Sequence, residues 1–318
     1  MSILCVGEMV ADIVVRPVPA DVQQRDSTIV EEISVVNGGD ALNTAVGLGR
    51  LGHDVAFIGK AGKDDFGRML VDIARNAGVD VSHVKVSQIY DNSKVVALIS
   101  ADGQRSFLHC PGSNQEFSAD DIEEDVLWGK NVFHIGGTFH LPSFDGEKGA
   151  AGVLARAQVL GAKTCMDVAF DHSGRWLETI GCCLPHLDFF MPSIGEVREM
   201  LNISDEVEAA RRFKEMGVRN VVIKLGEAGV YCSPQEEKAF YCDCYHVQAV
   251  DTTGAGDGFV GGFIGALDSG KCLEDCVLEG TANAAFVVQK VGATAGVPSR
   301  AELEAFIRDK NRPKVRYV

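Results

Sequence analysis

The chain has 318 residues, of which 46% are hydrophobic, so it can bury a substantial core as one large domain or two smaller ones. Its 45 aspartates and glutamates outnumber its 30 lysines and arginines, which gives a net charge of −15. This acidic balance argues against nucleic acid as a partner, because binding a phosphate backbone requires clustered positive charge.

Neither the cysteines nor the terminal residues indicate a zinc site, secretion or membrane insertion. The ten cysteines do not form the paired C-x-x-C units that bind zinc, so we expect reduced thiols in a cytoplasmic protein. The first residues lack a basic segment, and Glu8 and Asp12 interrupt their apolar run, so we expect neither a signal peptide nor a membrane-spanning segment. The basic residues between Lys310 and Arg316 are predicted to form a solvated tail.

The N-terminal region is predicted to consist of short strands. The apolar run Ile3–Val6 ends at Gly7 and is typical of a buried strand, and extended structure is predicted again over Ile13–Val15 and Ile29–Val36. Asp12 lies where the first strand would leave the core. From its position alone, this aspartate is equally suited to a turn, a helix cap or contact with a ligand.

A helix is predicted to begin after the pair Gly38-Gly39, with Asn43 about one turn into it. Its apolar residues recur at helical spacing: Leu42, Val46, Leu48 and Leu51. Because a Gly-Gly turn gives a small molecule access to the helix N-terminus, we expect Asn43 to contact a ligand rather than solvent alone.

A small additional sheet is predicted from a hairpin that follows a strand at 54–58 and a helix at 64–77. The strands Lys94–Ser100 and Ser106–His109 flank a turn that contains Asp102-Gly103, a typical hairpin sequence. They can join the strands near 13–16 and 29–36. Phe107 and His109 would then either face a ligand or pack within this sheet.

From Asn131 onward, strands and helices alternate. Strands are predicted at 132–135, 164–168, 187–190 and 220–224, and helices at 148–160, 194–201 and 207–216, with a loop at 136–138. This alternation predicts a mainly parallel sheet with helices on both faces and ligands at the carboxyl ends of its strands. Antiparallel strands at 229–232 and 239–245, then helices at 274–290 and 300–310, complete the predicted elements.

The stretch Val250–Gly262 reads V-D-T-T-G-A-G-D-G-F-V-G-G and has the features of a phosphate-binding site. Glycines let backbone N–H groups approach an anion, and a helix that begins there adds its free N–H groups and dipole. Asp257 would repel a phosphate, so we expect it to act as a base that takes a proton from an attacking hydroxyl. The chain contains no P-loop motif, and the G-x-G-x-x-G match at Gly256–Gly261 lacks the strand context of a dinucleotide site.

The sequence D-T-T-G-A-G-D at Asp251–Asp257 resembles the C-terminal signature of the PfkB (ribokinase-like) carbohydrate and nucleoside kinases. Asn37–Ala45, N-G-G-D-A-L-N-T-A, resembles the G-G-x-x-x-N substrate motif of the same family. This resemblance covers nearly the whole chain. It implies a single α/β domain over residues 1–318, a ribokinase-like three-layer αβα sandwich with a mainly parallel central sheet. It also implies a small β-sheet lid inserted from about 12–36 and 92–110.

The resemblance implies ATP-dependent phosphorylation of a hydroxyl, expected to be a primary one, on a sugar or sugar derivative. Asp257 would be the general base, and backbone N–H groups in the catalytic loop would form the anion hole. The residues assigned to this loop are Gly254, Ala255, Gly256 and Asp257. The residues assigned to substrate are Asp12, Gly38, Gly39, Asn43 and Phe107.

Further residues are assigned to cofactors by the same resemblance. ATP is expected along Lys224, Gly226 and Gly229, with Asn283 and Val287 flanking the adenine. Mg²⁺ is expected to be assisted through water by Glu196, although Ser193 stands where the family has asparagine. A monovalent cation, K⁺, is expected at Asp251, Thr253 and the carbonyl groups near Val287 and Gly292.

The sequence leaves three classes of acceptor open: a neutral sugar, a sugar acid and a nucleoside. Many sugar kinases of the family carry D-x-N-x-R where this chain has Asp167-Val168-Ala169-Phe170-Asp171, so the family's arginine is absent. A sugar acid would therefore need Arg16 or Arg105 from the lid, and a nucleoside would need an aromatic slot that includes Phe107 or Tyr90. We rank a neutral sugar first, a sugar acid second and a nucleoside third. A non-catalytic sugar or nucleotide sensor is the alternative outside the enzymes.

A homodimer formed through the lid is also expected. In Lys94–Ser100, Val95, Ala97 and Ile99 alternate with other largely apolar residues, so both faces of this strand can be covered. One face would cover the substrate and the other would pack on a second copy of the chain.

Overall fold

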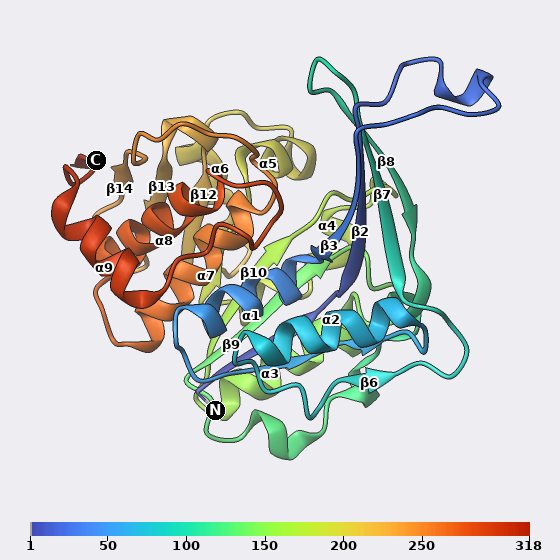
Figure 1. The fold of residues 1–318 in the computed structure, drawn as a ribbon. Coiled ribbons are helices and arrows are strands. Elements are labelled where there is room, and N and C mark those ends of the chain that lie inside the picture. Colours follow the sequence, from blue (N-terminus) through green and yellow to red (C-terminus); the bar gives the residue numbers. More distant parts are fainter. Residues whose placement is uncertain (1) are drawn as a thin grey trace.

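A nine-stranded sheet lies at the centre of the computed structural model, which describes residues 2–318 (Figure 1). Its strand order is β15-β14-β13-β12-β11-β10-β9-β1-β4, and the strands from β12 to β4 are parallel whereas β13, β14 and β15 pair antiparallel. The bounds are β1 Ile3–Gly7, β4 Val55–Ile58, β9 Val132–Thr138, β10 Lys163–Val168, β11 Phe189–Phe190, β12 Asn220–Lys224, β13 Val230–Ser233, β14 Phe240–Cys242 and β15 Val315–Tyr317.

Helices cover both faces of this sheet because its strands are apolar on both sides. Ile3 and Cys5 of β1 are buried against one layer of helices, and Leu4 and Val6 against the other. The first layer contains α1 (Asp40–Arg50), α2 (Asp65–Asn76), α7 (Ala255–Asp268) and α8 (Leu273–Val287). The second contains α3 (Gly152–Val159), α5 (Ile194–Leu201) and α6 (Glu206–Glu215), with the short α4 (Leu177–Ile180), while α9 (Arg300–Asp309) packs on α8. The predicted three-layer αβα sandwich is confirmed.

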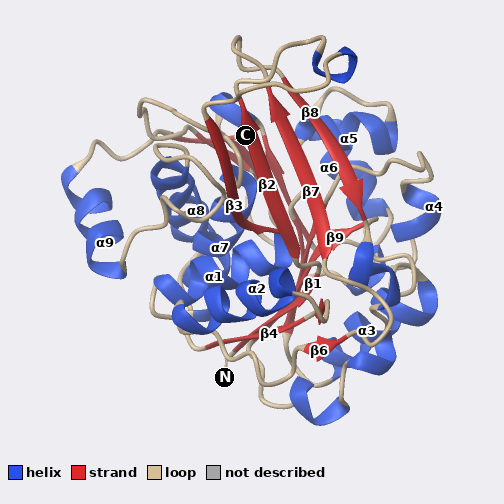
Figure 2. Cartoon of the chain, turned by 45° about the vertical axis from the view of Figure 1, so that its right-hand side comes forward, coloured by secondary structure: helices blue, strands red, loops and turns tan. Residues whose placement is uncertain are grey.

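A separate four-stranded sheet, the lid, projects from one side of the sandwich, and Figure 2 shows its strands side by side. Its order is β3-β2-β7-β8, with β2 Val10–Arg16, β3 Glu32–Gly38, β7 Ser93–Ile99 and β8 Arg105–Cys110. The register aligns Asp12 with Val95, and Val95 with His109, so these side chains lie on the same face. The small sheet predicted from the hairpin is therefore present. A two-stranded sheet of β5 (Lys60–Ala61) and β6 (Lys85–Val86) was not predicted.

Three local predictions differ from the structure. Asp12 lies within β2 opposite Val36, not in a turn, because β2 begins at Val10. β9 continues through the predicted loop to Thr138, since it remains paired with β10 up to that residue. The predicted solvated tail instead contains β15, which pairs with β14 at the sheet edge, and Arg316 Nη1 donates to Asp243 at 2.8 Å.

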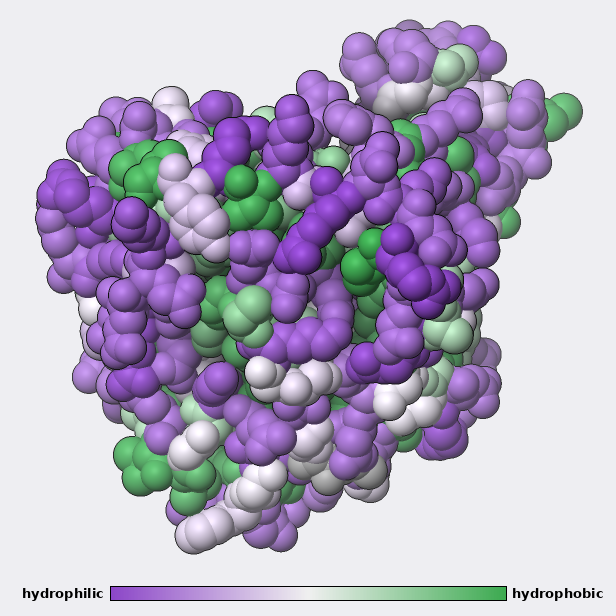
Figure 3. Space-filling model, turned by 90° about the vertical axis from the view of Figure 1, so that its left-hand side faces the viewer, coloured by the Kyte–Doolittle hydropathy of each residue, from purple (hydrophilic) through white to green (hydrophobic). Residues whose placement is uncertain are grey.

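The cysteines and the surface agree with the composition. All ten cysteines are free thiols. Within residues 2–318, no helix is long and apolar enough to cross a bilayer. On the face drawn in Figure 3, hydrophobic residues form separate patches among hydrophilic ones, as is usual for the surface of a folded domain.

Candidate active site

A cavity of about 1140 Å³ lies between the lid and the carboxyl ends of the parallel strands. It is lined from the lid by Asp12 and Phe107, from α1 by Asn43 and from the start of α7 by Asp257. The two sequence motifs are therefore brought together in one cavity, at the edge of the sheet where parallel strands place ligands.

The glycine loop (Asp251–Asp257) forms the N-terminus of α7 in a conformation that requires glycine. Gly254 is the N-cap at φ 74°, and a Cβ atom there would lie 2.4 Å from the Cα of Ala293. The N–H of Ala255 donates to Thr252 O at 3.2 Å. Within residues 2–318, the N–H groups of Gly256 and Asp257 have no acceptor, so they are available to an anion.

The carboxylate of Asp257 is held by a chain of three hydrogen bonds. Asn43 Nδ2 donates to Asp257 Oδ2 at 2.8 Å, and Asn37 Nδ2 donates to Asn43 Oδ1 at 2.7 Å. Thr294 Oγ1 donates to Asn37 Oδ1 at 2.9 Å. Because these residues come from β3, α1, α7 and the loop after α8, the orientation of Asp257 depends on the whole first helix layer.

Burial and neighbouring carboxylates raise the pKa of the acidic residues in the cavity. Burial raises the pKa of Asp257 to about 7, although the hydrogen bond from Asn43 and the charge of Lys224 act in the opposite direction. Burial, together with the charges of Glu8 and Asp257, raises the pKa of Asp12 to about 7. A carboxylate with a pKa near 7 can serve as a general base near neutral pH.

The predicted substrate residues lie next to one another. A Cβ atom on Gly38 would be 2.3 Å from Asp12 Oδ2, so this aspartate packs directly over the glycine. Gly39 is the N-cap of α1 at φ 91°, which gives the cavity access to the helix N-terminus. Phe107 is 53% exposed on the cavity face of the lid.

The sequence analysis missed several polar residues of the cavity, among them Glu8, His140 and Asp145. His140 Nδ1 lies 2.9 Å from Glu8 Oε2, and Asp145 Oδ2 accepts from Phe139 N–H at 3.0 Å. Within the described chain, the buried atoms His140 Nε2 and Asp145 Oδ1 have no partner, so they can bond a ligand. Glu8 and His140 each follow a parallel strand closely, which is the signal that could have identified them.

Aromatic rings line the side of the cavity opposite α7. The rings of His140 and His172 are stacked with centroids 5.8 Å apart, and His109 lies 5.1 Å from His172. Phe170 is 52% exposed and contacts His172 edge-on at 5.3 Å. These rings give the cavity an aromatic wall made of three imidazoles and one phenyl ring.

Only some of the residues predicted to bind the nucleotide lie on an open surface. Lys224, at the end of β12, pairs with Asp167 at 2.6 Å, and a Cβ atom on Gly256 would lie 3.4 Å from its Nζ atom. Lys224 therefore faces the glycine loop, where the phosphates of ATP would fit. Gly226 and Gly229 form the turn that follows.

Asn283 and Val287 are fully buried between α8 and α7. Asn283 Nδ2 donates to Gly258 O at 2.7 Å, and a Cβ atom on Gly258 would lie 2.8 Å from Val287 Cγ2. In this conformation both side chains pack against the buried side of α7 and do not face the cavity.

Glu196 and Ser193 form a capping box at the start of α5. Ser193 N–H donates to Glu196 Oε2 at 2.6 Å, and Glu196 N–H donates to Ser193 Oγ at 3.3 Å. Burial raises the pKa of Glu196, while the charge of Lys224 lowers it and that of Asp167 raises it. These three charged groups lie close enough to influence one another, and their two carboxylates suit the water shell of Mg²⁺.

The predicted residues of the monovalent-cation site are already hydrogen-bonded to one another. Asp251 Oδ1 accepts from Thr253 N–H at 3.0 Å, and Asp251 Oδ2 accepts from Gly292 N–H at 3.0 Å. Burial raises the pKa of Asp251, but these hydrogen bonds and the charge of Arg105 outweigh it, and the pKa lies below its usual value. The side chains of Asp251 and Thr253 also bind Arg105 of the lid.

Comparison with known proteins identifies relatives along most of the chain. An uncharacterized sugar kinase from Archaeoglobus fulgidus is 30% identical over 255 residues, 80% of this chain and 98% of the relative. A ribokinase from Haemophilus influenzae is 27% identical over 319 residues, 96% of this chain and 98% of the relative. The crystal structure of ribokinase from Thermotoga maritima has a TM-score of 0.82 at 26% identity and covers 97% of this chain and 99% of its own.

The sequence model of the pfkB family of carbohydrate kinases matches residues 1–300. That match includes Asn37–Ala45 and Asp251–Asp257, the two motifs that meet at the cavity. The chain therefore belongs to the pfkB family of carbohydrate kinases.

Proposed function

We propose that this protein transfers the γ-phosphoryl group of ATP to a primary hydroxyl of a neutral, polyhydroxylated sugar. The observation that carries the proposal is the hydrogen bond from Asn43 to Asp257, beside the free N–H groups of Gly256 and Asp257 at the start of α7. A base, an anion site and an acceptor cavity are thereby adjacent.

Asp257 would accept the proton of the acceptor hydroxyl as that oxygen attacks. ATP bound with Mg²⁺ supplies the phosphoryl group and part of the charge neutralisation. The N–H groups at the start of α7 and the ammonium group of Lys224 would stabilise negative charge on the transferred group. Asn43 would keep the carboxylate of Asp257 directed at the acceptor.

The charge of the cavity supports a neutral acceptor. Eight carboxylate residues but only one arginine, Arg175, line it, so the cavity offers a single guanidinium to pair with an anionic substrate. The two lid arginines that a sugar acid would need have other partners, since Arg16 donates to Glu32 at 2.8 Å and Arg105 to Asp251 at 3.1 Å. Asp171, not arginine, stands at the last position of the family's D-x-N-x-R motif.

A nucleoside is the second candidate, because aromatic rings line the cavity. Phe107 and Phe170 are both about half exposed, and either could stack on a base. The pair His140–His172 cannot sandwich a base, because its centroids are 5.8 Å apart and an intervening ring needs about 7 Å. Because Phe107 and Phe170 are exposed while Arg16 and Arg105 are engaged elsewhere, we place the nucleoside ahead of the sugar acid.

Replacing the base tests the chemical step. Asp257→Asn keeps the size of the side chain but removes its ability to accept a proton, so kcat should fall by about 10²–10⁴-fold. The KM for ATP should stay the same or decrease, because a negative charge near the phosphates is lost. Asp268→Asn, at the last residue of the same helix, is the matched control and should retain activity. Turnover near that of the unmodified enzyme in Asp257→Asn would exclude this role.

The pH dependence of kcat/KM tests the same residue without a substitution. Because the pKa of Asp257 is raised to about 7 and only the ionised form accepts a proton, kcat/KM should increase with pH through about 7. Asn43→Ala removes the hydrogen bond that lowers this pKa, so the acidic limb should move to higher pH. A rate that stays constant down to about pH 5 would contradict the assignment.

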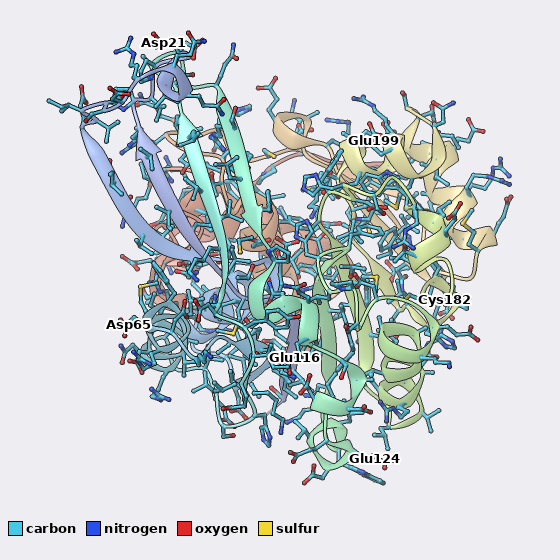
Figure 4. The ribbon with its side chains drawn as sticks, turned by 90° about the vertical axis from the view of Figure 1, so that its right-hand side faces the viewer. Asp21, Asp65, Glu116, Glu124, Cys182 and Glu199 are labelled. Carbon is cyan, nitrogen blue, oxygen red and sulfur yellow. The ribbon has the colours of Figure 1, made fainter. Side chains whose placement is uncertain are left out.

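A panel of neutral sugars, sugar acids and nucleosides tests the acceptor. We expect the highest kcat/KM with a neutral sugar. Asp12→Ala should raise KM for that sugar about 10-fold or more, because substrate hydroxyls would lack a partner in a closed site. Asp21→Ala, at the far end of the lid (Figure 4), is the control. A nucleoside that turns over with far higher kcat/KM than every sugar would overturn the ranking.

Association through the lid is tested by light scattering. The lid face that points away from the cavity is apolar and consists of Ile13, Val15, Ile33, Val35, Val96, Leu98 and Leu108. We expect a dimer of twice the chain mass of 34.1 kDa, and Leu108→Asp should convert it to a monomer. The chain mass alone for the unmodified protein at micromolar concentration would rule out this dimer.

A further inference from the structure

Arg105 connects the lid to the glycine loop. It is the first residue of β8, and its Nη1 and Nη2 atoms donate to Thr253 Oγ1 at 3.0 Å and to Asp251 Oδ1 at 3.1 Å. The side chain of Arg105 is 33% exposed and that of Asp251 is 15% exposed, so the pair is partly shielded from solvent. This contact joins residues that are 146 positions apart in the sequence.

Arg105 contacts Asp251 and Thr253, two of the residues assigned to a monovalent cation by the family resemblance. Asp251 Oδ1 accepts from the N–H and the hydroxyl of Thr253 as well as from Arg105, while Asp251 Oδ2 accepts from Gly292 N–H. The carbonyl group of Val288 accepts two backbone N–H groups. The residues therefore do not fit a bound potassium ion in this conformation.

A potassium ion and the guanidinium group of Arg105 cannot share these atoms. The guanidinium is permanently charged and holds its donors in a fixed plane. A second cation at Asp251 Oδ1 would lie within a few ångströms of it, where the repulsion between like charges is strong. Asp251 Oδ1 also has only two lone pairs, and three donors already contact it.

We propose that Arg105 takes the place of the monovalent cation, so that closure of the lid, and not potassium, completes the support of the glycine loop. Arg105 is a positioning residue: it contacts neither the base nor the cavity floor, and it acts through Asp251 and Thr253. Thr253 directly precedes Gly254, the N-cap of α7. Holding Thr253 therefore fixes the start of the helix whose N–H groups would receive the phosphoryl group.

This arrangement would couple the two substrates. The lid that covers the acceptor cavity also delivers the charge that orders the glycine loop. With the lid open, Asp251 would lose one cationic partner and the loop would be less ordered. The inference rests on the proposed function for its activity measurement, whereas its measurement of cation binding does not depend on that function.

The experiment compares the unmodified protein with Arg105→Ala, Arg105→Lys and Arg25→Ala in potassium or tetramethylammonium chloride at equal ionic strength. Arg25 pairs with Asp21 within the same lid and serves as the matched control. Two quantities are measured: kcat/KM for the best acceptor of the panel, and Tm without substrates. Tm reports cation binding directly, because a ligand that binds only the folded state raises it.

In the unmodified protein and in Arg25→Ala, neither quantity should respond to potassium. In Arg105→Ala, kcat/KM should fall about 10-fold or more in tetramethylammonium, the effect of losing hydrogen bonds to a charged group. Potassium or free guanidinium at low concentration should restore most of this loss, and potassium should raise Tm. Arg105→Lys should remain largely active and insensitive to potassium, because it keeps one positive charge at the site.

Activation of the unmodified protein by potassium, or a rise of its Tm with potassium, would overturn the proposal whatever the variants do. So would an Arg105→Ala protein that loses activity but responds neither to potassium nor to guanidinium. If no acceptor of the panel is phosphorylated, the proposed function fails, whereas the Tm measurements still decide whether Arg105 replaces the cation.

Discussion

The hydrogen bond between Asn43 and Asp257 is the contact on which the candidate site depends. It joins α1 to α7 across 214 positions of the sequence, and it brings the glycine pair of one motif next to the glycine loop of the other. Asn37 and Thr294 extend it to β3 and to the loop after α8. Because Asn43 is buried and each of its amide atoms has a hydrogen-bond partner, the position of the Asp257 carboxylate depends on how β3, α1, α7 and the loop after α8 pack together.

The same packing holds several carboxylates close together. Glu8, Asp12, Asp40 and Asp257 line one wall of the cavity, and burial raises the pKa of Asp12, Asp40 and Asp257. Crowding of this kind opposes folding when the groups are ionised, so it persists only where the surrounding structure compensates. Such compensation is typical of functional sites.

Features that depend on local sequence could be predicted. The alternation of apolar residues predicted the parallel sheet, and the two glycine motifs predicted which helix N-termini line the cavity. The turn at Asp102-Gly103 predicted the β7–β8 hairpin. Each of these depends on backbone freedom or periodicity within a few residues.

Contacts between segments far apart in the sequence could not be predicted in this way. Three such contacts join residues that no sequence periodicity relates: Glu8 with His140, Asp167 with Lys224, and Arg105 with Asp251. The burial of Asn283 and Val287 against α7 also depends on how α7 and α8 pack together, which no local pattern of the sequence indicates. The strand β15 was missed because its three residues are too few to show the alternation of apolar and polar residues that would distinguish a strand from a charged tail.

The hydrogen bonds of Asn37 also determine how the lid can move. Asn37 belongs to β3, a lid strand, yet both of its amide atoms are bound to the sandwich, to Asn43 and Thr294. The end of β3 nearest the base is therefore anchored, whereas the hairpin end of the lid meets the sandwich through the partly exposed Arg105. Consequently the lid can pivot about Asn37, so that the hydrogen bonds from Asn37 to Asn43 and from Asn43 to Asp257 persist while the hairpin end moves. Release of Arg105 in that movement would loosen Thr253 but leave the side chain of Asp257 held.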